Sequence, residues 1–485
     1  MVKEEDLRNM GFSEWFDWVL REAELYDYGR YPVKGFGVWM PYGFKLRKHV
    51  IDLMRSLLDS TGHEEILLPL LIPEDLLAKE SEHVRGFEDQ VFWVTHGGLD
   101  PLEIKLALRP TSETSLTYME SFWIKSYKQL PKKYYQVVSI FRYETRATRA
   151  MLRVREVTTF KEAHTVHEDF RDSERQVSEA VEIYSRFFDL LGIPYVVSRR
   201  PDWDKFPGAI YTIAFDTLMP DGRALQIGTV HNLGQNFTKV FEVKIQKRDE
   251  SIDYAWQTSY GISERVIATL ISTHGDEKGL ILPFKVAPIQ VIIVPIPAGS
   301  NEEKERVFLE ASKLSEYLKK EGFRVLADLD TEKAPSEKFA YWELKGVPLR
   351  IDLGPRELSE GRATIFRRDT LTRLKTPLER LPDTLRELGK EIDANLSRRA
   401  WDTFRTHVAE VSDLNALEEA LKKQKYLIEV PWCGLKECAD FITSKYGLEA
   451  LGTPLKVREE VKTSEIKCPV CGKRAVTHMR YARKY

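Results

Sequence analysis

The chain has 485 residues, of which 42% are hydrophobic, and its 73 Lys and Arg residues are balanced by 75 Asp and Glu residues, for a formal net charge of −2. This balance excludes a generally basic protein that coats nucleic acid, and the length predicts about two to four domains with buried cores. The acidic start of the chain and its short, proline-broken apolar runs predict a cytoplasmic protein that is not bound to a membrane.

Helical and strand-like patterns alternate in residues 1–283. Amphipathic stretches predict helices at residues 12–25, 44–60 and 170–191, and an apolar run, EEILLPLL, occupies residues 64–71. Strand-like stretches follow at residues 193–199, 209–218, 223–233 and 237–245. Because no crossover helices separate these strands, they indicate an antiparallel sheet, and we expect residues 1–283 to form one α+β domain.

The first candidate site stretch is LRPTSET, residues 108–114. Its polar residues Thr111, Ser112 and Glu113 fall where a strand gives way to a helix. Taken alone, this pattern is typical of a helix cap. A role in ligand binding depends on the other stretches.

Five arginines, at positions 142, 146, 149, 153 and 155, lie in FRYETRATRAMLRVREVTTFKEAHT, residues 141–165. The period of a strand predicts that Arg142 and Glu144 project from the same face. A planar guanidinium suits bidentate binding of a phosphate or carboxylate, and Phe160 on the returning strand offers a face for a purine ring. The alternative is a solvated hairpin with surface ion pairs.

Polar residues interrupt an apolar strand in ALQIGTVHNLGQNF, residues 224–237. A single His231 would be typical of a satisfied core histidine. Together with Gln226, Thr229 and nearby glycines, it indicates a backbone that a ligand approaches closely.

SYGISERVIATLI, residues 259–271, places Gly261 just before a helix. Ser263 is the expected N-cap, and Arg265 falls in the first turn. This arrangement can hold an anion through both the guanidinium and the helix N-terminus.

The pattern of hydrophobic and polar residues changes after the prolines at 283 and 288, which predict a linker. Alternating patterns predict strands at residues 290–296, 323–329, 348–354 and 362–368 and helices at 302–320 and 335–345. We expect residues 288–400 to form a small α/β domain. A charged helical stretch at about 384–410 leads to the last part of the chain.

All four cysteines lie in the tail, in PWCGLKECADF and KCPVCGK. The C-x4-C and C-x2-C spacings predict that Cys433, Cys438, Cys468 and Cys471 form one tetrahedral site for a structural Zn²⁺ in a C-terminal domain, residues 405–485. The alternatives are four reduced structural cysteines, or a site in which His478 replaces one ligand.

The order of these stretches resembles the three signature motifs of class II aminoacyl-tRNA synthetases. They are the segment ending at Pro69 of EEILLPLL, FRYE with its basic loop and return strand, and G-x-S-x-R at the start of a helix. TSE, Q-x-G-T-x-H-x-L-G-Q-N-F, HGDEKGLILPFKVAP and the cysteine tail are similar to prolyl-tRNA synthetases of the archaeal and eukaryotic type. The resemblance covers essentially the whole chain.

The resemblance implies an antiparallel-sheet catalytic domain followed by an α/β anticodon-binding domain. It implies ATP-dependent attachment of L-proline to tRNA(Pro) through prolyl adenylate, with release of pyrophosphate and AMP. By similarity, Arg142 contacts the α-phosphate and the substrate carboxylate, and Arg265 holds the γ-phosphate. Glu144 and Phe160 orient adenine. The nucleotide and Mg²⁺ site is completed by Gln226, Thr229 and Ser263.

For proline itself, Glu113 would pair with the secondary ammonium. Thr111 and His231 would take the remaining polar contacts, and Phe206 would close on the ring. Residues 166–258 leave no room for an inserted editing domain. Since a missing methylene is worth only about 1–3 kcal/mol, we expect misactivation of alanine or cysteine without hydrolysis of the mischarged tRNA.

Two further expectations follow from the resemblance, and two alternatives remain open. The motif around Pro69 implies a homodimer. Tyr485 is expected to bring its terminal carboxylate near the active site. A synthetase for threonine or glycine would share the ATP residues, whereas a non-catalytic nucleic-acid-binding relative would be expected to lack Arg142, Glu144 or Arg265; the chain has all three.

Overall fold

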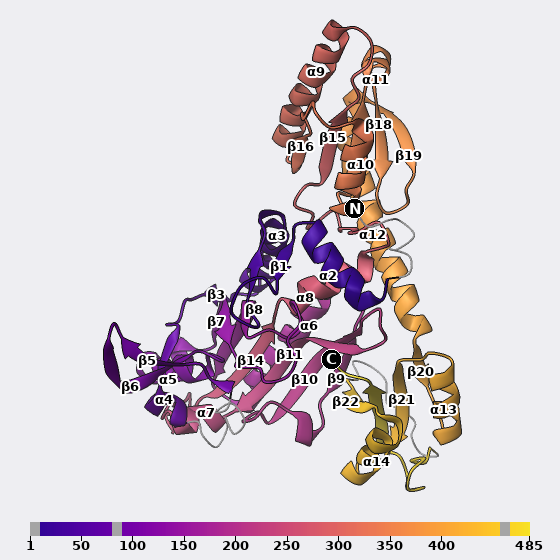
Figure 1. Ribbon diagram of the computed structural model, residues 1–485. Helices are drawn as coiled ribbons and strands as arrows, with labels where there is room; N and C mark the ends of the chain where they lie inside the picture. The colour runs from indigo at the N-terminus through magenta and orange to yellow at the C-terminus, as the bar shows by residue number, and fades with distance from the viewer. Residues whose placement is uncertain (1–9, 80–89, 456–465) are drawn as a thin grey trace.

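The computed structural model describes residues 10–79, 90–455 and 466–485. A large sheet with covering helices is followed by a smaller α/β unit and then by a C-terminal unit whose strands join the large sheet (Figure 1). Within the described residues, no helix has the length and apolar character needed to cross a lipid bilayer.

The large sheet has eleven strands, and most come from the first half of the chain. Their spatial order is β20 (Val408–Glu410), β21 (Leu427–Trp432), β23 (Thr477–Ala482), β22 (Glu449–Pro454), β9 (Val196–Arg199), β10 (Tyr211–Leu218), β11 (Ala224–Gly234), β14 (Trp256–Ile262), β8 (Glu156–His167), β7 (Lys132–Phe141) and β3 (Glu64–Glu65). Neighbouring strands are antiparallel except for β3–β7 and β20–β21. The predicted antiparallel sheet is therefore confirmed.

One predicted strand of this region is wrong. Residues 237–245 form the short helix α7 (Asn236–Val240) and then the strand β12 (Lys244–Gln246), which pairs with β13 (Ile252–Tyr254) outside the large sheet. Phe237, in α7, and Phe241, which caps the end of α7, are both buried, and they belong to two different hydrophobic clusters. Tertiary packing of these two rings prevails over the strand propensity of the segment.

Helices cover one face of the large sheet. The helix α6 (Phe170–Leu191) packs on β8, β11 and β14, and α3 (Pro41–Asp59) packs against α6. Smaller elements surround this core: α2 (Phe12–Glu22), β1 (Tyr26–Tyr28), β2 (Gly37–Trp39), β4 (Leu71–Pro73), α4 (Glu74–Ala78), β5 (Trp93–Gly97), β6 (Asp100–Leu108), α5 (Glu113–Trp123) and α8 (Arg265–His274).

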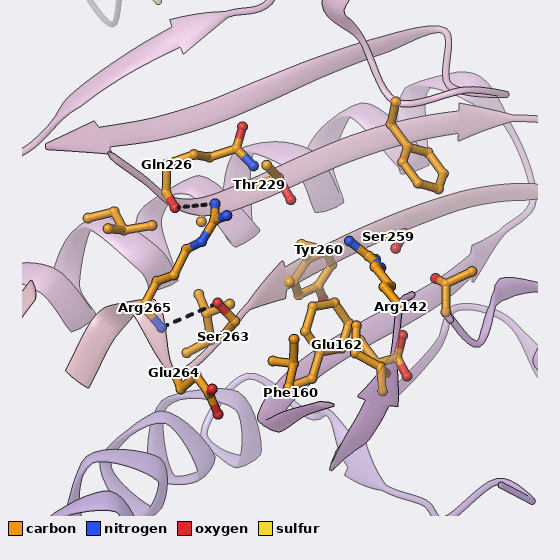
Figure 2. Close-up of a pocket in the computed structure, with 18 of the residues that line it drawn as sticks. Arg142, Phe160, Glu162, Gln226, Thr229, Ser259, Tyr260, Ser263, Glu264 and Arg265 are labelled. Carbon is orange, nitrogen blue, oxygen red and sulfur yellow. Dashed lines mark hydrogen bonds between the residues drawn. The ribbon is translucent and has the colours of Figure 1, made fainter. Parts of the chain in front are cut away.

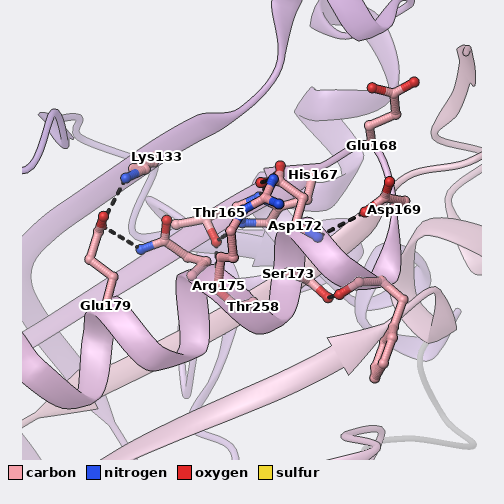
Figure 3. A network of polar contacts seen from close by, with 12 residues as sticks. Lys133, Thr165, His167, Glu168, Asp169, Asp172, Ser173, Arg175, Glu179 and Thr258 are labelled. Atoms are coloured by element: carbon pink, nitrogen blue, oxygen red, sulfur yellow. Dashed lines mark hydrogen bonds and ion pairs between the residues drawn. The ribbon is translucent and has the colours of Figure 1, made fainter. Parts of the chain in front are cut away.

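A polar network fixes α6 to the sheet (Figure 3). The Nδ1 atom of His167 lies 2.9 Å from Asp172 Oδ2, and its Nε2 atom lies 2.7 Å from the Thr165 hydroxyl. The Thr165 hydroxyl in turn contacts that of Thr258 at 2.5 Å. The hydrogen bond with His167 holds the pKa of Asp172 at about 2, so this carboxylate is ionised at neutral pH.

Alternation along β8 decides which side chains face away from α6. The Nζ atom of Lys161 donates to the Tyr184 hydroxyl of α6 at 2.7 Å, so Lys161 lies on the helix side. Successive strand residues point to opposite faces. Phe160, Glu162 and His164 therefore point to the other face, where the candidate site lies.

The α/β unit has a five-stranded sheet. Its order is β16 (Val325–Ala327), β15 (Val291–Pro295), β17 (Leu349–Leu353), β18 (Arg362–Arg367) and β19 (Arg373–Pro377), with β16, β15 and β17 parallel and the last two pairs antiparallel. Its helices are α9 (Asn301–Lys320), α10 (Pro335–Leu344) and α11 (Pro355–Glu360). The long helix α12 (Leu381–Thr406) leads from this unit back past the large sheet toward the C-terminal unit (Figure 1).

The C-terminal unit also contains α13 (Leu414–Lys422) and α14 (Lys436–Tyr446). Its strand β22 pairs with β9, bringing Thr453 opposite Arg199. Arg480 of β23 strengthens this junction, because its Nη1 donates to the Val197 carbonyl at 2.6 Å and to the Ser198 hydroxyl at 3.0 Å. Main-chain and side-chain hydrogen bonds thus attach the C-terminal unit to the large sheet.

Candidate active site

A cavity of about 340 Å³ opens on the face of the large sheet opposite α6 (Figure 2). It is lined by all eleven residues that the sequence assigned to ATP or proline: Thr111, Glu113, Arg142, Glu144, Phe160, Phe206, Gln226, Thr229, His231, Ser263 and Arg265. They come from segments up to 154 positions apart in the sequence (111 to 265), and the fold brings them to one place.

The register of the sheet explains how the floor of the cavity is built. His164 of β8 lies opposite Ser259 of β14, which lies opposite His231 of β11, which lies opposite Thr212 of β10. Residues directly opposite one another in antiparallel strands share a face. Four neighbouring strands therefore contribute one continuous row of polar side chains.

Arg142 enters the cavity from just beyond the end of β7. That strand ends at Phe141, so the prediction that Arg142 and Glu144 continue it is wrong, although both line the cavity. The Nε atom of Arg142 donates to the Pro110 carbonyl at 3.1 Å, and its guanidinium lies 5.9 Å from the centre of the Phe160 ring. Burial lowers the pKa of Arg142, and nearby carboxylates, Glu113 foremost, oppose this shift.

Arg265 is the first residue of α8. The helix begins one residue later than predicted, with Glu264 in the cap position, and the Ser263 hydroxyl accepts a hydrogen bond from the Arg265 amide at 3.3 Å. The Arg265 guanidinium donates to the carbonyls of Leu152 at 2.9 Å and Gln226 at 3.4 Å. Burial lowers its pKa to about 10, and the positive charge of Arg142 adds to the effect. The two guanidiniums repel each other, so an anion between them is favoured.

Glu113 is held at one end of the cavity by two hydroxyl groups. Its Oε1 atom accepts from Ser259 at 2.8 Å, and Thr111 donates to Oε2. Ser112, the residue before α5, makes no side-chain cap bond and instead donates to Glu162 at 2.5 Å. The helix-cap interpretation of TSE is therefore wrong for its two hydroxyl groups. They donate instead to Glu113 and Glu162, which both line the cavity.

His231 and Phe206 close the same end. Their rings lie 4.7 Å apart, and the Thr212 hydroxyl contacts His231 Nδ1 at 2.9 Å and accepts from the Phe206 amide at 2.9 Å. Burial lowers the pKa of His231 to about 3, so the imidazole is neutral at physiological pH. It offers a polar contact without adding a charge.

The sequence reasoning missed Glu162 and His164. His164 Nε2 lies 3.4 Å from Glu162 Oε2, and its Nδ1 lies 4.0 Å from Glu113 Oε1. Burial acts to lower the pKa of His164, but the hydrogen bond with Glu162 and the charge of Glu113 outweigh it and raise the pKa. The period-two spacing from Phe160 through Glu162 to His164 was the available signal.

Glu264 is a second missed residue. It lines the cavity, is 1% exposed, and accepts hydrogen bonds from the Thr158 amide at 3.0 Å and the Thr158 hydroxyl at 2.7 Å. Burial raises its pKa to about 7. It fastens the beginning of α8 to the beginning of β8.

Gln226 is oriented by a buried ion pair. Arg200 binds Asp216 through both terminal nitrogens at 2.8 and 2.7 Å and donates to Gln226 Oε1 at 2.9 Å. With its oxygen so engaged, the Gln226 amide has its N–H groups left to donate to a ligand.

Pro69 lies outside the cavity, between β3 and β4. Arg109 holds this segment by donating to the Leu68 carbonyl at 2.8 Å. The side chains of Leu67 and Leu70 are 79% and 41% exposed. The segment therefore presents apolar surface to solvent at the β3 edge of the sheet.

The four cysteines converge in the C-terminal unit. Cys433 Sγ lies 3.6 Å from Cys438 Sγ and 3.5 Å from Cys471 Sγ, and all four sulfur atoms, with that of Cys468, lie within 4.8 Å of one another. A tetrahedral site with Zn–S bonds of about 2.3 Å requires S–S distances of about 3.8 Å. The cluster fits that geometry, whereas His478 is paired with Glu410 at 3.2 Å.

Tyr485 packs onto the catalytic sheet. Its amide donates to the Ala224 carbonyl at 3.1 Å, and its hydroxyl donates to Asp221 at 2.5 Å. The guanidiniums of Arg223 and Arg149 lie 5.6 and 6.0 Å from its ring centre. Tyr485 is not among the described residues that line the cavity, but Ala224 is two residues from Gln226.

Three family models match successive parts of the chain. They are the tRNA synthetase class II core domain (G, H, P, S and T) at residues 92–274, the anticodon binding domain at 290–388 and the prolyl-tRNA synthetase C-terminal domain at 414–485. Together with the antiparallel sheet and its arginine-bearing cavity, they define a class II aminoacyl-tRNA synthetase.

Relatives resemble the chain over nearly its whole length. The proline–tRNA ligases of Aeropyrum pernix and Sulfurisphaera tokodaii are 56% and 57% identical over 474 residues, covering 98% of this chain and 97% and 98% of their own lengths. The structure of Giardia lamblia prolyl-tRNA synthetase in complex with prolyl-adenylate matches with a TM-score of 0.93 at 36% identity, covering 98% of both chains. The chain belongs to the prolyl-tRNA synthetase family.

Proposed function

We propose that this protein attaches L-proline to tRNA(Pro) in two steps. Proline and ATP form prolyl adenylate and pyrophosphate, and the terminal adenosine of the tRNA then accepts the prolyl group with release of AMP. The convergence of all eleven assigned residues on one cavity, in a chain of this family, carries the proposal. Because charging serves translation, we place the protein in the cytoplasm.

The roles of the arginines follow from charge. The carboxylate of proline and the phosphates of ATP are both anions, and their reaction requires close approach. Arg142 is assigned to the α-phosphate and the substrate carboxylate, and Arg265 to the γ-phosphate. No covalent enzyme intermediate is needed, because positioning and preorganised positive charge lower the barrier.

The remaining nucleotide contacts are assigned by the chemistry of each group. Phe160 provides a ring face for adenine, and Glu144 orients the base. Gln226 has N–H groups suited to a phosphate, whereas Thr229 and Ser263 offer hydroxyl oxygens. Hard oxygen donors suit Mg²⁺, which keeps several of its waters and neutralises phosphate charge when bound; Thr229 and Ser263 would hold it together with ATP.

Proline-dependent exchange of pyrophosphate into ATP tests this assignment. Proline should support the fastest exchange, alanine and cysteine slower exchange, and threonine and glycine little. We also expect no hydrolysis of alanyl-tRNA(Pro) by this chain. Faster exchange with threonine or glycine than with proline would reject the assignment.

A homodimer is proposed from the exposed apolar segment around Pro69. Replacing Leu67 by Arg places a charge where the partner surface would exclude water, so we expect light scattering at micromolar concentration to shift from dimer to monomer. Leu309→Arg, on α9 and 55% exposed, is the matched control. A wild-type monomer, or an unchanged dimer in Leu67→Arg, would contradict the proposal.

The four cysteines are proposed to bind a structural Zn²⁺. Sites of this kind contribute about 10 kcal/mol or more, and four thiolates leave no open position for catalysis. Cys471→Ser should release the metal and lower the melting temperature, whereas Lys467→Ser, outside the ligand set, should do neither. Protein purified without chelator that holds less than about a tenth of an equivalent of zinc would rule the site out.

Tyr485 is proposed to bring a fixed negative charge toward the active site. A chain ending at Lys484 still has a terminal carboxylate, but it lies one residue earlier and lacks the Tyr485 side chain that anchors it. We expect adenylate formation to slow by about threefold to tenfold, because the negative charge moves away from its place beside the arginines. Tyr485→Phe, which removes only the hydroxyl bond to Asp221, separates this effect from packing. Equal rates at equal melting temperature for the full and shortened chains would leave Tyr485 without this role.

A further inference from the structure

A second cavity, of about 410 Å³, lies on the other side of the arginine-rich loop. It is bounded by α2, by β1 with the residues after it, and by residues 148–150 of the loop. None of the described residues that line it also lines the catalytic cavity. Its volume is in the range of small-molecule sites.

Unpaired polar atoms gather at this cavity. Of the ten described side-chain polar atoms that are buried without a hydrogen-bond partner, three belong to its lining: the hydroxyls of Tyr26 and Tyr28 and the Nη2 atom of Arg149. Tyr26 is only 1% exposed, and Tyr28 lies near Thr148 without a hydrogen bond of good geometry. Buried polar atoms without partners are costly, and they often mark the place of a bound group.

These three atoms select a ligand that accepts hydrogen bonds. A guanidinium only donates. Burial raises the pKa of Tyr26 and of Tyr28, so both hydroxyls remain protonated and able to donate. A ligand that satisfies all three therefore needs several acceptor atoms close together, as an oxyanion has.

The charges of the lining favour the same choice. Three arginines face two aspartates, and Asp27 is already engaged by Arg30, whose Nε donates to it at 2.8 Å. Burial raises the pKa of Asp17, against the opposing effect of Arg149 and Arg21. Arg21 is likewise engaged by Glu22 at 3.0 Å. Arg149, whose Nη2 atom has no partner among the described residues, is therefore the lining cation left to meet a ligand, and the raised pKa of Asp17 favours the neutral form of the nearby carboxyl group.

The Arg149 guanidinium is held in place before any ligand arrives. It lies 5.5 Å from the ring centre of Phe12, 5.9 Å from that of Phe16 and 6.0 Å from that of Tyr485. Cation–π contacts of this kind fix a guanidinium without using its N–H donors. A preorganised donor loses little entropy on binding.

The two cavities share one short hairpin. The Arg149 amide donates to the Arg153 carbonyl at 2.7 Å, and the Arg153 amide donates to the Arg149 carbonyl at 2.9 Å. Residues 148–150 line the second cavity, and residues 151–154 line the catalytic one. The Leu152 carbonyl also accepts the hydrogen bond of Arg265. A ligand bound to Arg149 would therefore stiffen the loop that supports the nucleotide.

We propose that this second cavity binds one phosphate group, and that its occupancy orders the loop of residues 148–154. The phosphate is either that of a free small molecule or that of an RNA backbone, since both present the same acceptor oxygens. Phosphate binding at this site does not depend on the proposed aminoacylation, whereas the effect of its occupancy on a bound nucleotide rests on that proposed function.

Inorganic phosphate is the probe for the first experiment. The full chain is saturated with proline and an ATP analogue that cannot be cleaved between its α- and β-phosphates, so that the γ-phosphate position at Arg265 is filled, and melting is followed in potassium phosphate against potassium chloride of equal ionic strength. We expect phosphate to raise the melting temperature of the wild type. The double variant Tyr26→Phe with Tyr28→Phe should bind phosphate at least tenfold more weakly, and Tyr317→Phe on α9 is the control.

The melting temperature of the same double variant in chloride shows whether the substitutions disturb folding. Because it removes two hydroxyls that lack partners, it should be at least as stable as the wild type in chloride. Tyr28→Phe alone, at a less buried position, should give an intermediate loss of phosphate affinity if the double variant does not fold.

Binding of a tRNA(Pro) transcript identifies the source of the phosphate. A parallel loss of tRNA affinity in the double variant assigns the site to an RNA phosphate, and unchanged tRNA affinity with lost phosphate binding assigns it to a free anion. The proposal is overturned if tRNA binding is unaffected in the double variant and one of two further results is found. Either the wild type shows no phosphate-dependent shift in melting temperature, or the double variant retains phosphate affinity within twofold of the wild type.

Discussion

Glu113→Gln is expected to raise the Michaelis constant for proline by about 100-fold, while that for ATP changes by less than about threefold. A secondary ammonium placed in this pocket loses its hydrating water, and without a carboxylate partner its burial costs several kcal/mol. A 100-fold change in the Michaelis constant corresponds to about 2.7 kcal/mol of this cost. Glutamine keeps the shape of the side chain, so the variant removes charge without opening a cavity.

Proline-dependent pyrophosphate exchange at varied proline and varied ATP measures both constants. Glu174→Gln is the matched control, because Glu174 also accepts hydrogen bonds, from Tyr211 at 2.5 Å and Asn232 at 2.7 Å, but is not among the described residues lining the cavity. Melting temperatures establish that both variants are folded. An unchanged proline constant in Glu113→Gln would remove Glu113 from the proline pocket.

The surroundings of Glu113 show why a buried carboxylate is tolerated there. Ser259 and Thr111 donate to it, and His164, which also faces Glu162, lies 4.0 Å away. Charges in such a network are stabilised jointly, so the loss of one member alters the others. For this reason the exchange assay compares constants for two substrates in one variant, where a general distortion would raise both.

The cavity residues could be identified from sequence because each carries chemistry at a fixed spacing. Local patterns singled out Arg265, in the first turn of a helix four residues after Gly261, and the three polar residues Gln226, Thr229 and His231 that break an apolar strand. Their roles toward ATP and proline came from the resemblance to the family. Glu162 and His164 were overlooked because an acidic and a basic residue in a charged hairpin resemble a surface ion pair. Only the register of β8 against β14 shows that they are buried.

The junction between the C-terminal unit and the large sheet could not be predicted. The pairing of Thr453 with Arg199 joins residues 254 positions apart in the chain, and neither segment carries a local signal for its partner. The segment FTKVFEVKI failed for a different reason, since β-branched and aromatic residues suit a strand and a short helix alike. Tertiary packing of Phe237 and Phe241 decided between them.

Arg142→Gln is expected to lower kcat/KM for adenylate formation by about 1,000-fold, or about 4 kcal/mol. This guanidinium is assigned to both reacting groups, the substrate carboxylate and the α-phosphate, and its contribution grows as negative charge builds up between them. Arg142 is only partly exposed to solvent, and charge interactions are screened less away from water, which makes the effect large. The loss should therefore appear in kcat as well as in the Michaelis constants.

Arg142→Lys separates charge from geometry. Lysine keeps the positive charge but lacks the planar pair of donors. We therefore expect kcat/KM of Arg142→Lys to be about tenfold higher than that of Arg142→Gln, and still well below that of the wild type. Arg199→Gln, an exposed arginine stacked 4.4 Å from the Tyr211 ring centre, controls for loss of an arginine on the same sheet. Single-turnover adenylate formation is the measurement, with melting temperature as the check on folding, since Arg142 also holds the Pro110 carbonyl. A rate within about threefold of wild type in Arg142→Gln would show that the transition-state charge is stabilised elsewhere, with Arg265 the next residue to test.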